Sequence, residues 1–271
     1  MAWQDEVTSM FSGRKDGKLW NDLYRSNPVT FEEHLFQSRR DFTVNYVLSH
    51  STPASTIIDV GCGAAPVVSR LLANDRDCIG LDYSFDMLRF SRDVLNQSQQ
   101  HNTALLQADC QALPFPDNHF DIIVCLGVIS YIQDYQPALK ELYRIIKPDG
   151  TLIISFRNTY NPVLFDPIIG LKTFVKWLLR KHEDDNSVGR FLKFKAVRSD
   201  IEREGFEYLA HTSIGMGPFR WNGKPIFSHR RSIKFDRAID RFLKSVHLHS
   251  SLGKWLSDVS LWIYRKPNNN L

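Results

Sequence analysis

Long apolar runs are missing from this sequence of 271 residues, although 43% of them are hydrophobic. The longest nearly uninterrupted apolar stretch, residues 122 to 132, falls well short of the roughly 20 residues that a membrane-spanning helix needs. The first residues (MAWQDEVTSMFSGRKDGK) also lack the apolar segment of a signal peptide. We therefore expect a cytoplasmic protein that forms one integrated domain with insertions.

Cysteine is also scarce. The four cysteines, Cys62, Cys78, Cys110 and Cys125, lack the paired spacing of metal ligands. Three of them lie beside or within apolar runs, which is typical of small reduced residues in cores and loops. The sequence therefore predicts no metal site.

Net charge is low, +4 at neutral pH, but its distribution along the chain is uneven. Acidic residues outnumber Lys and Arg by five in residues 51 to 155, whereas Lys and Arg outnumber acidic residues by ten in residues 156 to 271. This asymmetry indicates a half that binds a cofactor and a basic half that meets something anionic.

Strand and helix patterns alternate along the chain. Strands are predicted at residues 55–60, 78–82, 104–108, 120–126, 151–156, 206–213 and 257–265. Helices are predicted at residues 66–73, 84–95, 136–146, 167–181, 198–204 and 233–246, with Ser84 and Ser199 as N-caps and residues 215–229 as a loop. Pro148-Asp149-Gly150 is predicted as a turn. The alternation implies an α/β fold with a doubly wound, mostly parallel sheet covered by helices on both faces.

The segment Ile57 to Pro66 (IIDVGCGAAP) is the most informative one. Gly61 and Gly63 stand between a predicted buried strand and a helix, where the missing Cβ atoms let the backbone approach a ligand closely. Pro66 occupies the position of the third glycine of a dinucleotide motif, and the strand carries Asp59. Because a carboxylate would repel two phosphates, the pattern favours a cationic ligand over a nicotinamide or flavin dinucleotide.

Two more carboxylates follow predicted strands. Asp82 closes the second strand about twenty residues after the glycines, where a carboxylate can grip a ribose diol. Asp109 follows the third strand. Since the carboxyl ends of parallel strands form the ligand crevice of an open sheet, we expect Asp59, Asp82 and Asp109 to lie together there.

At this point the sequence resembles the class I methyltransferases that depend on S-adenosylmethionine (SAM), particularly the small-molecule group that includes the ubiquinone and menaquinone methyltransferases. The matching segments are DVGCGAAP at 59–66, GLDYSFDML at 80–88, ADCQALPFPDNHFDIIVCLGVISYI at 108–132 and LYRIIKPDGTLIISF at 142–156. Their order and spacing are intact over roughly residues 50 to 160. The resemblance implies a seven-stranded Rossmann-like sheet, SAM as cofactor and S-adenosylhomocysteine as product.

The resemblance also implies roles for individual residues. Asp59, Gly61 and Gly63 would frame the methionine and ribose part of SAM, and Asp82 would hold the ribose hydroxyls. Tyr83 and Met87 would flank the adenine, Asp109 and the Cys110 amide would bind its polar edge, and Leu126 and Gly127 would line the sulfonium region. Met87 is equally well explained as ordinary helix packing.

A catalytic base is optional for methyl transfer, because the sulfonium already activates the methyl group and orientation of the acceptor supplies much of the rate. Many relatives carry a His where this sequence has Tyr131, and a Tyr is a poor base at its usual pKa near 10. The candidates for a base toward a hydroxyl acceptor are Tyr131, His211 and His229, although each His is also explained as a surface or packing residue.

The remaining parts flank residues 51–156, the SAM-binding core. Residues 1–50 have the aromatic and helical character of a lid over the cofactor, with Tyr24 as the preferred contact, although a helix packed on the sheet edge is an equal alternative. Residues 157–271 would complete the sheet and add acceptor-binding helical insertions.

Two of these insertions carry basic stripes. Lys172, Lys176 and Arg180 repeat opposite Leu171, Phe174, Val175 and Leu178, and Lys234, Arg237, Arg241 and Lys244 repeat opposite Phe235, Ile239, Phe242 and Val246. The simpler interpretation is a solvated basic face over an apolar stripe that packs on the core. The sharper one is a lipid-like or anionic acceptor, or peripheral contact with the anionic inner surface of a membrane.

The favoured function is SAM-dependent methylation of a small-molecule or lipid-like acceptor. A methyltransferase for nucleic acid or protein is the alternative among enzymes, but the sequence has no base-methylation motif and no appended RNA-binding module, so nucleic acid is disfavoured. A SAM-binding protein without turnover is the alternative from another class. The sequence leaves the oligomeric state open.

Overall fold

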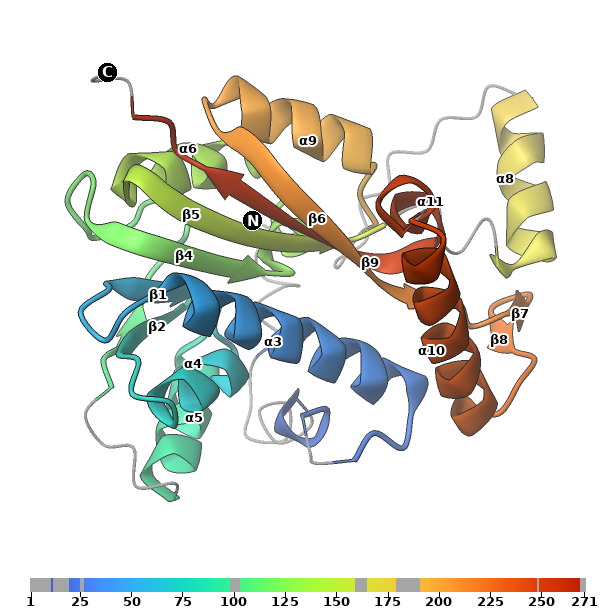
Figure 1. Cartoon of the computed structure of the whole chain (residues 1–271), viewed down its shortest axis with the longest axis horizontal. Helices are drawn as coiled ribbons and strands as arrows, with labels where there is room; N and C mark the ends of the chain where they lie inside the picture. The colour runs from blue at the N-terminus through green and yellow to red at the C-terminus, as the bar shows by residue number, and fades with distance from the viewer. Residues whose placement is uncertain are drawn as a thin grey trace.

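The computed structural model describes residues 11, 20–24, 27–97, 103–158, 165–178, 191–247 and 249–268. Seven strands form one sheet with the order β3-β2-β1-β4-β5-β9-β6 (Figure 1). They are β1 (Ile57–Val60), β2 (Cys78–Asp82), β3 (Leu105–Gln107), β4 (Phe120–Leu126), β5 (Ile146–Arg157), β6 (Glu207–Met216) and β9 (Ser257–Arg265). The first five are mutually parallel, and β9 runs antiparallel between β5 and β6. The predicted seven-stranded, doubly wound sheet is thus confirmed.

Helices cover both faces of this sheet. They are α3 (Phe31–His50), α4 (Pro66–Leu72), α5 (Phe85–Gln97), η1 (Val128–Tyr131), α6 (Gln136–Ile145), α8 (Pro167–Leu178), α9 (Phe194–Arg203), α10 (His229–Ser245) and α11 (His249–Leu256). A small hairpin, β7 (Arg220–Trp221) and β8 (Lys224–Pro225), precedes α10. No helix in the described ranges combines the length and the apolarity needed to cross a membrane.

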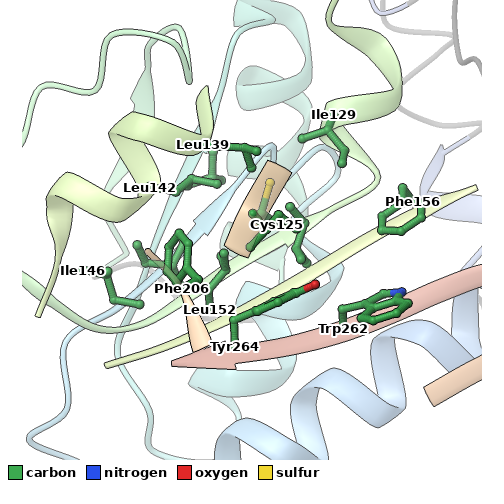
Figure 2. Packing of buried hydrophobic residues seen from close by; sticks show 14 of the residues in the cluster. Cys125, Ile129, Leu139, Leu142, Ile146, Leu152, Phe156, Phe206, Trp262 and Tyr264 are labelled. Carbon is green, nitrogen blue, oxygen red and sulfur yellow. The ribbon is translucent and has the colours of Figure 1, made fainter. Parts of the chain in front are cut away.

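Side chains of successive strand residues point to opposite faces, and each face has its own core. One core joins β4 residues Ile123 and Cys125 to α6, α9 and η1, as Figure 2 shows around Cys125, Trp262 and Tyr264. The other core joins Ile122 and Val124 to α3, α4, α5 and α10. Burial on both faces explains why these strands are almost continuously apolar in the sequence.

Several local predictions hold and others need correction. Ser84 caps α5 as predicted, since its Oγ accepts from the Met87 amide at 3.3 Å. The predicted turn at Pro148 is instead an irregularity inside β5, which starts at Ile146 because that residue already pairs with Phe120. Ser199 is not a helix cap, because α9 begins five residues earlier with Lys193 as N-cap.

The segment after β6 is more structured than the predicted loop of residues 215–229. It contains the end of β6, the β7–β8 hairpin and the start of α10. The helix α11 has no counterpart among the predicted elements. The prediction of helix up to residue 181 extends beyond the described residues.

The apolar stripes of the two basic helices do not all pack on the core. On α8 the four predicted stripe residues are exposed: Leu171, Phe174, Val175 and Leu178. On α10 the buried residues are Ser232, Ile233, Asp236 and Leu243, whereas Phe242 and Val246 are exposed. The prediction of core-facing apolar stripes is therefore wrong for α8 and for the end of α10, because these stripe residues remain exposed.

Candidate functional site

A cavity of about 690 Å³ opens at the carboxyl ends of the parallel strands. It is lined by all of the predicted site residues except His211: Tyr24, Asp59, Gly61, Gly63, Asp82, Tyr83, Met87, Asp109, Cys110, Leu126, Gly127, Tyr131 and His229. The strand ends thus bring these residues together, as expected for an open parallel sheet.

The glycine turn closes tightly over the end of β2. The amides of Gly61 and Cys62 both donate to the Leu81 carbonyl, at 2.7 and 2.9 Å. Gly61 has a φ of +76°, and a Cβ there would collide with the Val128 side chain. A residue without a Cβ is therefore required at position 61 by both the backbone and the packing.

Asp59 is 2% exposed at the end of β1. Burial and the neighbouring Asp82 raise the pKa of its carboxyl and Arg39 lowers it, so that the pKa reaches about 7. A buried carboxylate of this kind is costly unless a cation balances it, so the position suits a ligand with a positive group.

Asp82 joins the glycine turn to the start of α5. Its Oδ2 accepts from the Gly63 amide at 2.8 Å, and its Oδ1 accepts from the Ser84 amide at 2.9 Å. Burial raises the pKa of Asp82, while these backbone hydrogen bonds partly offset the rise. Because each carboxylate oxygen has two lone pairs, both oxygens retain acceptor capacity toward the cavity.

Four residues that follow Asp82 in the sequence also line the cavity: Tyr83, Met87, Asp109 and Cys110. Tyr83 is 45% exposed, whereas Met87 is buried and its Cε lies 3.7 Å from where a Cβ of Gly63 would be. Asp109 Oδ1 accepts from the Gln111 amide at 2.9 Å. Burial raises the pKa of the Cys110 thiol to about 12, so the thiol stays protonated at neutral pH and is not a nucleophile.

Arg39 is a cavity residue that the sequence analysis missed. It extends from α3, donates from Nη2 to the Tyr24 hydroxyl at 3.2 Å and lies over the Phe36 ring at 4.7 Å. Its Nη1 would be 3.0 Å from a Cβ on Gly127, so the missing side chain makes room for the guanidinium. Its Nε is buried without a hydrogen-bond partner among the described residues. Because Nε is buried, any contact of Arg39 with a ligand in the cavity would come from its terminal Nη atoms.

Aromatic side chains from the N-terminal region cover the cavity. Phe11 packs edge-on against Tyr131 at 5.2 Å and against Trp20 at 5.7 Å, and its carbonyl accepts from the Ser84 hydroxyl at 2.6 Å. Tyr24 contacts the Phe36 ring at 5.9 Å. The rest of the predicted lid divides between α3, which packs on the sheet, and residues outside the described ranges.

The three candidate bases differ in position. Burial raises the pKa of Tyr131, while Arg157 and Arg39 oppose the rise, so its hydroxyl stays protonated at neutral pH. His229 Nδ1 accepts from the Phe31 amide at 3.2 Å, which places the proton of the neutral ring on Nε2. His211 stacks on Trp262 at 4.8 Å and contacts the Tyr208 hydroxyl, away from the cavity lining. His211 therefore cannot act on a ligand in this cavity.

The second end of the cavity carries charges that the sequence analysis did not single out. Asp258 is 2% exposed, and its carboxylate lies 3.4 Å from Arg157 and 4.0 Å from Arg220. Both distances exceed the roughly 2.7–2.9 Å of a strong charge-assisted hydrogen bond. The two guanidinium groups thus share one buried carboxylate and keep donors for a ligand.

No signal in the sequence pairs these residues, because Arg157 ends β5, Arg220 begins β7 and Asp258 belongs to β9. Only the antiparallel insertion of β9 beside β5 brings them to one wall. A basic residue just after the fifth strand was the one available hint.

The family model that matches this chain is described as a methyltransferase domain and covers residues 58–154. A demethylmenaquinone methyltransferase of Listeria monocytogenes is 33% identical over 177 residues, which is 60% of this chain and 74% of that protein. An uncharacterized methyltransferase of Bacillus subtilis is 26% identical over 134 residues, 49% of this chain and 53% of that protein.

Solved structures share the fold at low sequence identity. Magnesium protoporphyrin IX methyltransferase of Synechocystis, with bound SAH, has a TM-score of 0.64 at 14% identity and covers 97% of this chain and 99% of its own. A structure described as a sarcosine dimethylglycine methyltransferase of Galdieria sulphuraria has a TM-score of 0.60 at 13% identity, over 93% and 98% of the two chains.

The sequence similarity, the sheet order and a cavity built from acidic strand ends point to the same conclusion. The chain belongs to the class I SAM-dependent methyltransferases.

Proposed function

We propose that this enzyme transfers the methyl group of SAM to a small, lipid-like acceptor such as the electron-rich ring of a reduced lipid quinone, a hydroquinone. The curated relatives named demethylmenaquinone methyltransferase support this acceptor class. The cavity lining supports it too, because apolar side chains from α3 and the N-terminal region line the same cavity as the guanidinium groups of Arg157 and Arg220.

The residues in the part of the cavity around Asp59, Asp82 and Asp109 fit SAM. The methionine part of SAM carries an ammonium group and a carboxylate, which suit the buried Asp59 carboxyl and the guanidinium of Arg39. Asp82 has acceptor capacity for the ribose hydroxyls, and Asp109 with the Cys110 amide for the polar edge of the adenine. Tyr83 and Met87 would flank the adenine ring, and Leu126 and Gly127 would adjoin the methionine part.

Bound SAM supplies a methyl group that the sulfonium charge already activates. The protein then has to hold the acceptor in line and exclude water, and Phe11, Trp20 and Tyr24 cover the cavity in a manner suited to both tasks. Tyr131 is a protonated hydroxyl, and His229 presents an Nε2 donor, so both would orient an acceptor oxygen rather than remove its proton. In this proposal the methyl group bonds to the acceptor as its bond to sulfur breaks, and the proton that it replaces passes to water after the transfer. Orientation of the acceptor therefore carries the reaction.

The observation that carries the acceptor proposal is the wall formed by Arg157, Arg220 and Asp258. Two guanidinium groups that share one carboxylate leave a net positive charge of one. Such a wall binds an oxygen with partial or full negative charge, for example a quinone carbonyl, a phenolate or a carboxylate headgroup. The apolar part of the acceptor would lie against residues such as Phe31 and Leu35.

The test measures methyl transfer from SAM to a short-chain demethylmenaquinone, which is supplied in its oxidised form and in its chemically reduced form. The release of S-adenosylhomocysteine reports the transfer. Arg220→Gln should raise the KM for the acceptor about tenfold, the loss expected for one charged hydrogen bond. SAM affinity should stay unchanged. Tyr131→Phe should lower kcat without abolishing it.

Turnover with that quinone that does not depend on Arg220 would contradict the acceptor site. Turnover only with RNA or a protein substrate would favour the alternative enzyme class. SAM binding without turnover on any acceptor would indicate a non-catalytic SAM-binding protein.

A further inference from the structure

One end of the molecule carries a surface on which several large apolar side chains are exposed. It consists of α8, the β7–β8 hairpin with the following residues Ile226 and Phe227, and the exposed face of α10, and we call it the end surface. Figure 1 shows these elements grouped on the right, beyond the edge of the sheet.

Specific contacts hold the end surface together. Asp166 is fully buried before α8, and its carboxylate accepts from the amides of Ile168 and Ile169 and from those of Asn222 and Gly223 in the hairpin, at 2.6 to 3.2 Å. Lys172 Nζ donates to Asn222 Oδ1 at 2.9 Å. The four backbone bonds to one carboxylate fix the hairpin against the start of α8.

An aromatic cluster connects the hairpin to α10. The ring of Phe219, just before β7, contacts the rings of Phe165, Phe227 and Phe235 at 5.1, 6.0 and 5.1 Å. Phe165 precedes α8, and Phe235 belongs to α10. These ring contacts therefore join the three parts of the end surface into one packed unit.

Large apolar side chains stand out from this unit. On α8, Leu171, Phe174 and Leu178 are 60%, 56% and 63% exposed. On the hairpin and the residue after it, Trp221 and Ile226 are 59% and 55% exposed. Single exposed apolar residues are common on proteins, but a contiguous group marks a surface that meets another apolar phase or a partner.

The same surface is strongly basic. Six exposed basic residues stand on α10: Arg230, Arg231, Lys234, Arg237, Arg241 and Lys244. Its two acidic residues are Asp236, which is buried against His34, and Asp240, which pairs with Lys244. Lys172 and Lys224 add two exposed positive charges on α8 and the hairpin. This combination of exposed cations and exposed apolar side chains is complementary to a binding partner with an anionic surface and an apolar interior.

The end surface adjoins the acceptor end of the cavity. Pro218, Arg220 and Pro225 line the cavity and belong to the hairpin region, and His229 lines it from the first residue of α10. A molecule that leaves an apolar phase in contact with Trp221 and Ile226 would thus move along the hairpin to the wall formed by Arg157, Arg220 and Asp258.

We propose that the end surface docks on the headgroup layer of an anionic lipid membrane, with Leu171, Leu178 and Trp221 inserted and the α10 cations on the phosphates. Apolar side chains at the headgroup boundary and cations near the phosphates are what such a layer binds. The delivery of a lipid-like acceptor rests on the proposed function, whereas docking itself does not. Nucleic acid would pair with the cations but would leave the exposed aliphatic residues in water.

The experiment is co-sedimentation of the full chain with vesicles of phosphatidylcholine alone and of phosphatidylcholine mixed with phosphatidylglycerol. The wild type should bind the mixed vesicles, and added NaCl should weaken this binding. The double variant Arg237→Glu with Arg241→Glu should weaken vesicle binding about tenfold or more, because each basic residue near an anionic membrane contributes about 1 kcal/mol to binding. Leu171→Asp with Leu178→Asp should weaken it at both low and high salt.

Matched controls lie elsewhere on the surface. Leu209→Asp changes a residue of β6 that is 44% exposed, and Arg70→Glu reverses an exposed charge on α4. Both should bind vesicles as the wild type does, and thermal unfolding should show that all variants are folded.

Two outcomes would overturn the proposal: absence of wild-type binding to the mixed vesicles, including the case in which only RNA is bound at the same salt, or equal losses in the control variants. Calorimetric SAM binding and methylation of a detergent-dispersed quinone report separately on the proposed function. Docking with no quinone turnover would reject the acceptor and keep the membrane surface, and the reverse result would do the opposite.

Discussion

Asp82 Oδ2 accepts a hydrogen bond from the Gly63 amide at 2.8 Å, across the gap between the ends of β1 and β2. This bond makes the second acidic residue part of the glycine turn. A change at Asp82 therefore acts on both the ligand contact and the shape of the turn.

Asp82→Ala should weaken SAM binding by about 3 kcal/mol, or roughly a hundredfold. The variant loses the two hydrogen bonds that the ribose hydroxyls of SAM would donate to the Asp82 carboxylate. Calorimetric titration with SAM measures this loss. The matched control is Asp77→Ala, an exposed residue just before the opposite end of β2. Similar losses in the two variants would contradict a direct role for Asp82.

SAM affinity should rise with pH up to about 7, where the Asp59 carboxyl ionises. In the folded protein the pKa of Asp59 is about 7, above its ordinary value of 3.8. Between pH 3.8 and about 7, folding of the ligand-free protein therefore takes up a proton, and its stability falls as pH rises through this range. A bound ammonium group favours the carboxylate, and affinity should change by at most about tenfold per pH unit below 7. Titrations across this range measure it.

Asp59→Asn should remove that pH dependence and stabilise the ligand-free protein at pH 8, because a costly buried charge is gone. An unchanged slope in the Asn variant would assign the proton to another group. Thermal unfolding at pH 5 and 8 provides the stability comparison.

Gly61→Ala should lower the free energy of unfolding by roughly 2 to 4 kcal/mol, since it combines backbone strain with a collision against Val128. Gly223→Ala is the matched control, because Gly223 has a similar φ of +83° and nothing within 4 Å of its missing Cβ. The difference between the two variants in urea unfolding measures the collision alone. Adding Val128→Ala to Gly61→Ala should recover that part, and no recovery would refute the collision.

The buried pair of His34 Nε2 and Asp236 Oδ2, 2.8 Å apart, joins α3 to α10. His34→Ala should destabilise the protein by roughly 2 to 4 kcal/mol, because it leaves a buried carboxylate with only the Met216 amide as a described donor. A double-mutant cycle with Asp236→Asn in urea unfolding isolates the pair. Lys244→Ala, which breaks the exposed pair with Asp240, should cost less than about 1 kcal/mol. Equal costs for the two changes would argue against the buried pair.

The core of the fold could be predicted from the sequence because its signals are local. The strand at 120–126 and the last strand at 257–265 have the predicted limits, since apolar runs bounded by polar residues define them. The cap at Ser199 and the turn at Pro148 failed, because helix packing from Phe194 and strand pairing from Ile146 override local propensity.

The cofactor end of the cavity was likewise accessible from the sequence. Gly61, Asp82 and Asp109 stand at the ends of consecutive parallel strands, and that topology alone brings them to one edge. Arg39 escaped prediction because the sequence of a helix that carries Arg39 and Arg40 side by side does not reveal which of them points at Gly127.

The amino-acid sequence by itself thus determined the sheet, the acidic and glycine-rich strand ends and the family, because each depends on short motifs in a fixed order. Only the tertiary structure decided the cluster of Arg157, Arg220 and Asp258 and the end surface. Asp258 meets Arg157 and Arg220 because β9 inserts antiparallel beside β5, and the apolar side chains of α8 remain exposed. Such contacts join residues far apart in the chain, and periodicity shows which residues share a face but not what that face meets.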